Sequence, residues 1–182
     1  MTKFFLLFTL TAFVLLTPSC LFTRQNQRYY VLVPETNGTA QTTYSDCILE
    51  NVRLPSFLDR HEISYLADTG EVVRLSKAKW AQSLGTLVKE NLTSAVRQRI
   101  GTPTDTPAVA MTVILDQFWM TADGTFLVAG FIELRSLSTS DSRRKPFAFQ
   151  LPSLGQPSVE LVVTQTRTAL NKILDELAHA KE

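Results

Sequence analysis

The side chains that most often carry catalysis or bind metals are few and scattered in this sequence. It contains two histidines, His61 and His179, which lie far apart along the chain. A metal site or a histidine-based triad needs ligands that converge in space, and the spacing brings no such partners together. The sequence also lacks a Gly-rich phosphate loop, a Cys-x-x-Cys pair and a His-Glu-x-x-His helix. We therefore expect both histidines to be exposed, and no metal or cofactor to be bound.

One tripeptide, Asp68-Thr69-Gly70, has the letters of an aspartic protease active site, in which two aspartates share a proton. The chain holds one copy of it, so such an enzyme would have to be a symmetric dimer. Asp and Gly are also common turn formers, and the apolar residues on both sides are what a plain hairpin needs. The tripeptide is therefore predicted to be a turn.

Two carboxylates, Asp116 and Glu133, fall on long strands that are predicted to face each other. They could approach one another as an acid/base pair would. Arg135 is nearby in the sequence, however, and a surface charge cluster is the favoured interpretation. No catalytic residue is assigned, and the protein is predicted not to be an enzyme.

A cysteine at the end of an N-terminal apolar run offers a different chemistry. Cys20 directly follows Ser19, and this pair resembles a bacterial lipobox, although Thr17 occupies the place where leucine is usual. The alternative is a buried cysteine within an uncleaved segment. Two or more acyl chains on one cysteine give stable membrane anchoring. We therefore predict Cys20 to be the lipid anchor.

Residues 1–19 have the features of a secretory signal, with Lys3 followed by an apolar run over residues 4–16. That run is too short for a membrane span, which needs about 20 residues. Residues 20–27 are then the lipidated cysteine and a tether, which is at most roughly 23 Å long for the seven residues after the cysteine. Leu21 follows the cysteine in place of aspartate, and this resemblance to outer-membrane lipoproteins implies an outer-membrane anchor facing the periplasm.

The composition bounds the remaining function classes. Removing residues 1–19 lowers Lys+Arg from 18 to 17, against 17 Asp+Glu, so the mature chain is neutral and no nucleic-acid surface is expected. The one basic run, Arg143-Arg144-Lys145, is predicted to be a solvated turn. If Cys20 carries lipid, Cys47 has no intramolecular disulfide partner, and it is predicted to be a small core residue.

Alternating apolar residues and turn formers predict strands on both sides of a long helix. The predicted strands are residues 28–33, 47–54, 62–67, 71–75, 108–120, 125–137 and 147–151. Two hairpin turns are predicted, at Asp68-Thr69-Gly70 and Ala122-Asp123-Gly124.

Two amphipathic helices are predicted, over residues 79–100 and 158–178. In the first, apolar residues recur at three- and four-residue spacing from Trp80 onward, and Gly101 follows as a stop. The second has a similar stripe and starts after Pro157. The order strands, helix, strands, helix predicts an α+β fold, a single domain with a mainly antiparallel sheet and two long amphipathic helices.

Several segments that follow the lipid-type signal form a recognisable pattern. They are Tyr29-Tyr30-Val31-Leu32, Val52-Arg53-Leu54-Pro55-Ser56-Phe57-Leu58-Asp59-Arg60 with Ile63, Trp80-Ala81 with Leu84, and Phe118. With them, the chain resembles the ABC-type transport auxiliary lipoproteins, the PqiC/YmbA-like family, over nearly all of residues 28–182. The segments themselves are interpreted as scaffold, with Trp80 anchoring the first helix to the sheet.

The resemblance implies a lipid-anchored periplasmic subunit that cooperates with an ABC transporter and MCE-type subunits in moving lipid or other apolar cargo between the inner and outer membranes. It also implies contact with those partners, a possible homo-oligomer, and no catalytic residue. The alternative is an outer-membrane assembly lipoprotein that chaperones or plugs a β-barrel.

Overall fold

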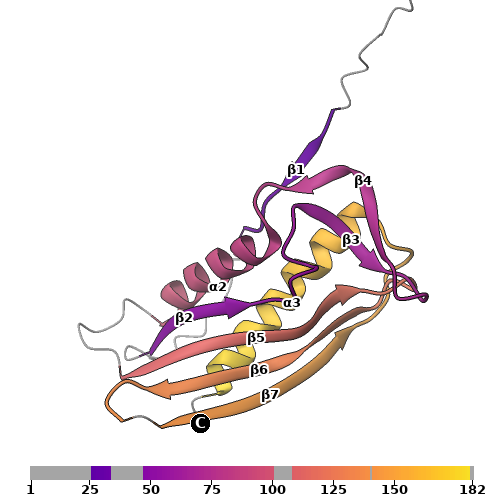
Figure 1. Ribbon diagram of the computed structural model, residues 1–182. Helices are drawn as coiled ribbons and strands as arrows, with labels where there is room; N and C mark the ends of the chain where they lie inside the picture. The colour runs from indigo at the N-terminus through magenta and orange to yellow at the C-terminus, as the bar shows by residue number, and fades with distance from the viewer. Residues whose placement is uncertain (1–25, 34–46, 101–107, 140, 181–182) are drawn as a thin grey trace, which may run out of the picture.

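The chain folds into two β-sheets and two long helices that pack against each other (Figure 1). The computed structural model describes residues 26–33, 47–100, 108–139 and 141–180. The elements follow the order β1, β2, β3, β4, α2, β5, β6, β7, α3. This order confirms the predicted α+β fold with strands, helix, strands, helix. Among the described residues, no helix is both long and apolar enough to cross a bilayer.

The larger sheet has four strands in the order β2-β5-β6-β7. Strand β2 is parallel to β5, and the pairs β5–β6 and β6–β7 are antiparallel. These strands are Cys47–Arg53 (β2), Val109–Met120 (β5), Phe126–Ser136 (β6) and Ser142–Leu151 (β7). On β5 and β6, buried and more exposed residues largely alternate, because one face of the sheet covers the core and the other faces outward.

The smaller sheet has three strands in the order β1-β4-β3, with β1 parallel and β3 antiparallel to β4. The strands are Arg28–Tyr30 (β1), Glu62–Leu66 (β3) and Val72–Trp80 (β4). A parallel bridge between Leu66 and Thr121 joins the end of β3 to the residue after β5. The two sheets therefore meet at this point.

The helices are Leu84–Ile100 (α2) and Val159–His179 (α3), and α2 packs against β2 and α3 while α3 also contacts β3, β6 and β7. The side chain of Ser158 begins α3 by accepting a hydrogen bond from the backbone N–H of Leu161. Of the side chains that the structure describes, those of the predicted apolar stripes are buried, except that Val159 is half-buried, and the inward residues of both sheets are buried as well. Cys47 is 2% exposed, which confirms its place in the core.

The first helix begins later than the sequence predicts. Trp80 ends strand β4, where its N–H donates to the carbonyl oxygen of His61 at 2.7 Å and it lies opposite Tyr30 in the parallel register. The helix starts at Leu84, with Ser83 before it as the capping residue. The prediction of a helix from residue 79 was wrong. Trp80 and Leu84 are four residues apart, which is a helical spacing, but Trp80 belongs to the strand and only Leu84 to the helix.

The basic triplet Arg143-Arg144-Lys145 is also placed differently from the prediction, since it lies in strand β7 and not in a turn. The strand extends from residue 142 and not from 147 as predicted. Pro146, which suggested a boundary, is tolerated because β7 is the edge strand of its sheet.

Candidate functional site

The segments that carry the family resemblance converge in the core. Leu58, Trp80, Leu84 and Phe118 all line one small internal void of about 20 Å³. Trp80 and Phe118 are each 1% exposed, and Phe118 packs edge-on against Phe126 with ring centroids 5.2 Å apart. This arrangement agrees with the interpretation of these residues as scaffold, although Trp80 anchors the end of β4 and not a turn of helix.

Asp59 links the loop after β2 to the first turn of α2. Its Oδ1 accepts a hydrogen bond from the backbone N–H of Gly85 at 2.9 Å, and the carbonyl oxygen of Arg60 accepts one from Leu84 N–H at 3.0 Å. A side chain at Gly85 would be too close, because its Cβ would lie 2.6 Å from Oδ1 of Asp59. The loop is thereby fixed to the positive end of the helix.

Phe57 points the other way and is presented to solvent. Its side chain is 38% exposed, while the neighbouring Leu58 is 8% exposed. The ring of Phe57 lies 5.9 Å from that of Trp119, which is half-buried. Nε1 of Trp119 is buried without a hydrogen-bond partner. Two aromatic rings therefore meet on the outside of the molecule, where β2, β3 and β5 come together.

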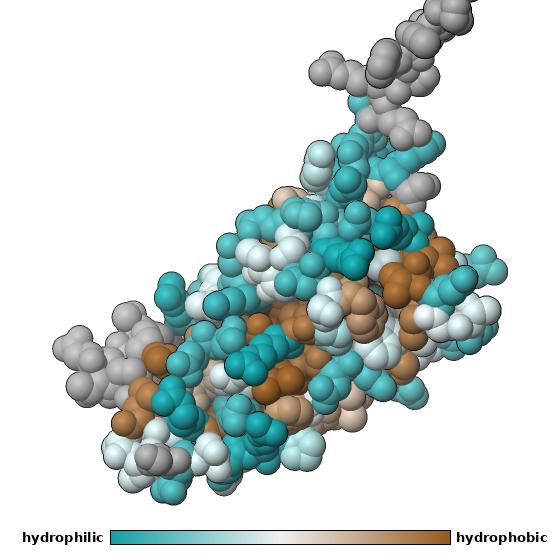
Figure 2. Space-filling view, viewed as in Figure 1, coloured by the Kyte–Doolittle hydropathy of each residue, from teal (hydrophilic) through white to brown (hydrophobic). Residues whose placement is uncertain are grey.

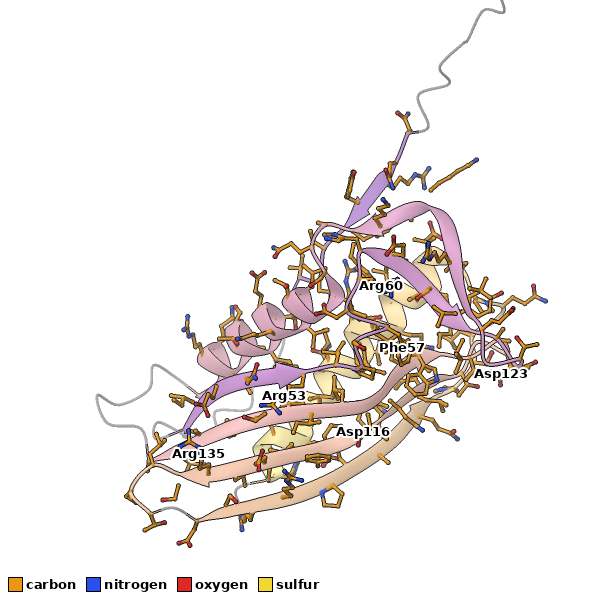
Figure 3. The ribbon with its side chains drawn as sticks, viewed as in Figure 1. Arg53, Phe57, Arg60, Asp116, Asp123 and Arg135 are labelled. Atoms are coloured by element: carbon orange, nitrogen blue, oxygen red, sulfur yellow. The ribbon has the colours of Figure 1, made fainter. Side chains whose placement is uncertain are left out.

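A hollow of about 150 Å³ lies beside this aromatic pair, and we name it the Phe57 hollow. Its lining residues are Phe57, Arg60, Glu62, Ser64, Val72 and Arg74. Figure 3 places Phe57 and Arg60 between the two sheets, and Figure 2 shows the same face as a mosaic of hydrophobic and hydrophilic residues. Exposed aromatic and arginine side chains around a small hollow are the composition expected of a protein-contact surface.

Known proteins are similar to this chain over most of its length. The family model for the ABC-type transport auxiliary lipoprotein component matches residues 30–178. The chain belongs to this family. Membership gives it an auxiliary role in ABC-type transport, association with an ABC transporter system, and the membrane-anchored periplasmic location of a lipoprotein.

Two solved structures share the fold of this family member. One is protein XCC0632 from Xanthomonas campestris, which is 15% identical, has a TM-score of 0.67, and aligns over 82% of this chain and 91% of its own. The other is an uncharacterized protein with 15% identity, a TM-score of 0.69, and coverage of 86% of this chain and 99% of its own. The search of curated proteins gave no match.

The residues weighed for catalysis do not assemble into a site in this family member. His61 and His179 are both exposed, as predicted, and they lie on different elements. Asp68-Thr69-Gly70 forms the predicted hairpin turn, in which Gly70 has a φ of +82° and its N–H donates to the carbonyl oxygen of Ala67. No group of three His, Cys, Asp or Glu side chains that could hold a metal ion occurs within the described ranges.

Asp116 and Glu133 are not brought together, because the antiparallel register pairs Glu133 with Thr112. Asp116 lies four residues further along β5. Arg144 Nε donates to Glu133 Oε1 at 3.3 Å, and Arg135 Nη2 donates to both carboxylate oxygens of Glu50 at 3.1 Å. The surface charge cluster is thus present, with Glu50 in place of Asp116.

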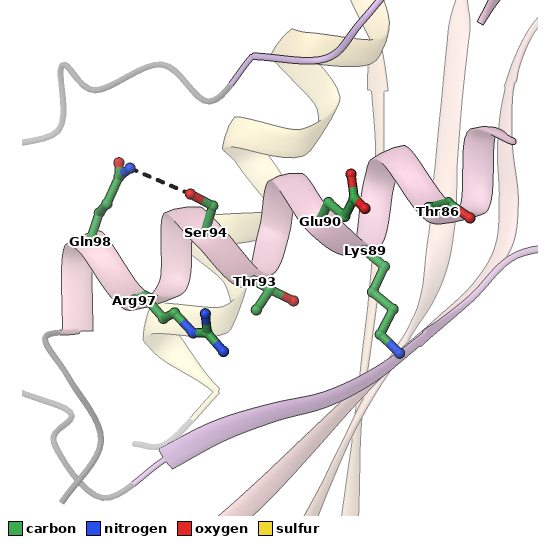
Figure 4. Close-up of a pocket in the computed structure, with 7 residues that line it drawn as sticks. All are labelled: Thr86, Lys89, Glu90, Thr93, Ser94, Arg97 and Gln98. Carbon is green, nitrogen blue, oxygen red and sulfur yellow. Dashed lines mark hydrogen bonds between the residues drawn. The ribbon is translucent and has the colours of Figure 1, made fainter. Parts of the chain in front are cut away.

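A larger hollow of about 710 Å³ runs along the outside of α2, but its described lining comes from that one helix (Figure 4). The lining residues are Thr86, Lys89, Glu90, Thr93, Ser94, Arg97 and Gln98. Figure 4 shows Lys89 and Arg97 pointing to one side of the helix and Glu90 to the other. Opposite charges that diverge from a single helix do not form a binding site.

The Phe57 hollow was not predicted from the sequence. Its residues come from the loop after β2 and from β3 and β4, and the hollow depends on how these elements meet. Phe57 and Arg60 both belong to the segment from Val52 to Arg60 that carries the family resemblance. An aromatic and a basic residue close together after a strand were the one signal in the sequence that could have indicated a contact surface here. Cys20, the predicted anchor, lies outside the described residues.

Proposed function

We propose that this chain is a non-enzymatic subunit of an ABC/MCE-type transport system, lipid-anchored through Cys20 at the outer membrane and facing the periplasm, where it helps move lipid or other apolar cargo between the two membranes. The observation that carries the proposal is the family match over residues 30–178 directly after a lipobox-like sequence. The partners are the MCE-type and ABC subunits, with a homo-oligomer as a further arrangement.

The Phe57 hollow supports a role in binding. The aromatic pair of Phe57 and Trp119 offers apolar area, and Arg60 and Arg74 offer charge beside it. Interface hot spots are enriched in aromatic residues and arginine near the centre of a patch. We propose that an MCE-type subunit contacts the protein here.

The rigid attachment of this loop supports the same role. Leu58 is held in the core, and Asp59 is hydrogen-bonded to the first turn of α2. Phe57 is therefore presented by a loop that is already ordered, and binding loses less side-chain and loop freedom than it would with an unanchored loop.

Co-purification from detergent-solubilised membranes tests the proposal. Full-length protein should recover MCE-type and ABC subunits, and Phe57→Ala should weaken that recovery. Leu154→Ala is the matched control, because Leu154 is 68% exposed and lies outside the hollow. Recovery of a β-barrel without transporter subunits would instead support the assembly lipoprotein and contradict the proposal.

Acylation is tested separately. Labelled fatty acid should enter the wild-type protein, and Cys20→Ser should abolish the labelling because the thiol is the proposed attachment point. An unlabelled wild-type protein would contradict the anchor.

A further inference from the structure

The first described residues carry a row of exposed side chains that the proposed function does not use. Tyr29 is 64% exposed, Val31 48% and Val33 58%, while Leu32 between them is 8% exposed and Tyr30 packs against the core. In an extended chain, alternate residues point to opposite sides. Tyr29, Val31 and Val33 therefore form one outward row, which we name the N-terminal row.

The N-terminal row is held firmly against the domain. Strand β1 pairs with β4, and the carbonyl oxygen of Val31 accepts a hydrogen bond from Arg167 Nη2 on α3 at 3.2 Å. The hydroxyl of Tyr30 donates to Glu160 Oε1 at 3.4 Å. The position of the row relative to the fold is thus fixed, and any surface that it touches is oriented with respect to the whole domain.

The position of the row in the sequence limits what can cover it. Nine peptide units separate Cys20 from Tyr29, so an extended chain spans at most roughly 32 Å between them. No other described segment is closer to Cys20 along the chain. If Cys20 is acylated, the row is kept within a short distance of the bilayer.

The chemistry of the row suits a lipid surface. Tyrosine is enriched where membranes meet water, since its ring is apolar and its hydroxyl can be hydrated. Lys79 lies directly opposite Tyr29 in the parallel register and supplies a basic group on the same face as the row, whereas the exposed Arg28 alternates to the other face. Two acidic residues are also close: Glu62 lies opposite Lys79 on its other side, and Glu160 accepts from the hydroxyl of Tyr30. Basic groups beside exposed apolar residues favour anionic headgroups.

We infer that the N-terminal row rests on the headgroup region of the bilayer that holds the acyl chains of Cys20. This contact adds a second attachment and sets the orientation of the domain on the membrane. The inference depends on the proposed acylation of Cys20, but it is independent of the transport partner.

Lipid-depth quenching tests the contact. Full-length acylated protein carrying Val31→Cys is labelled with an environment-sensitive dye and reconstituted into vesicles of phosphatidylethanolamine and phosphatidylglycerol that contain a spin-labelled lipid. Leu154→Cys is the control, since Leu154 is also exposed, and the wild type gives the background because Cys47 is buried. Quenching at position 31 should exceed that at position 154 by about twofold or more if the row enters the headgroup region.

The outcomes separate the two claims. Equal quenching at the two positions, in protein that floats with the vesicles, contradicts the membrane contact and leaves the anchor in place. Protection from a water-soluble quencher without quenching by lipid means that a protein covers the row, which also contradicts the inference. Protein that does not float contradicts both the anchor and the contact.

Discussion

Arg143 donates a hydrogen bond from Nη2 to the carbonyl oxygen of Ala180, 2.8 Å away, and so joins strand β7 to the end of helix α3. Lys145, two residues further along the same side of the strand, donates from Nζ to the carbonyl oxygen of His179 at 2.7 Å. The last carbonyl groups of a helix lack intrahelical donors and carry a partial negative charge. The two basic side chains satisfy these groups and fix α3 on the sheet.

Replacing Arg143 with methionine should lower the free energy of unfolding by about 1 kcal/mol, because one charged hydrogen bond to the end of α3 is lost while the aliphatic part is retained. Urea denaturation would show a lower midpoint with an unchanged slope. Arg53→Met is the control, since Arg53 is an exposed arginine on strand β2 and is not in the last turn of a helix. An Arg143 variant as stable as this control would mean that the hydrogen bond contributes nothing.

Replacing Trp80 with alanine should lower the free energy of unfolding by about 3–5 kcal/mol, because its 1% exposed ring fills the core beside Phe118. Urea denaturation again gives the measurement. Tyr29→Ala removes an aromatic ring that is 64% exposed and should change stability by less than about 0.5 kcal/mol. Similar losses in the two variants would contradict the role of Trp80 as a core anchor.

Replacing Asp59 with alanine should destabilise the fold by about 0.5–2 kcal/mol, since the N–H of Gly85 loses its acceptor at the start of α2. Asp59→Asn keeps an acceptor oxygen and should lose less. The measurement is the midpoint of thermal unfolding followed by far-UV circular dichroism. If the asparagine and alanine variants unfold at the same temperature, the hydrogen bond is not what secures the loop.

The carboxylate of Asp123 gives the protein a predictable acid response. The pKa of Asp123 is lowered first by the hydroxyl of Thr121 and then by the backbone N–H and hydroxyl of Thr125. These groups stabilise the charged form, so their contribution to stability is present at pH values above the unfolded-state pKa. It is lost as the pH falls through the lowered folded-state pKa.

An NMR titration of the Asp123 carboxyl carbon should therefore give a midpoint below the value in the urea-unfolded protein. Thr121→Val removes the leading donor and should raise the midpoint toward that unfolded value. Equal midpoints in folded and unfolded wild type would rule out these hydrogen bonds as stabilising the charged form.

Local patterns in the sequence were sufficient for most of the elements. The Asp68-Thr69-Gly70 turn, the hairpin at Asp123 and the Ser158 start of α3 each depend on a few neighbouring residues, and all three are found in the structure. The buried stripes of both helices were also predictable, because the helical period reports burial directly.

Features set by distant partners were not predictable. Trp80 is extended because it pairs with Tyr30, fifty residues earlier, and no local pattern records that pairing. Arg143 looked like a solvated turn residue because its partner, Ala180, is at the other end of the domain. The register of β5 and β6 separates Asp116 from Glu133, and the close approach of Gly130 to the carbonyl oxygen of Ile114 appears only once the strands are paired.

The central claim is that this domain works by binding a transporter subunit through the Phe57 hollow. Photo-crosslinking in intact cells tests it most directly, with a photoreactive residue at position 57 and a control at Leu137, which is 42% exposed and lies outside the hollow. We predict that position 57 crosslinks to an MCE-type subunit and that position 137 does not. A protein that gives the same adducts at both positions, or none at position 57 while remaining in the membrane fraction, would contradict the claim.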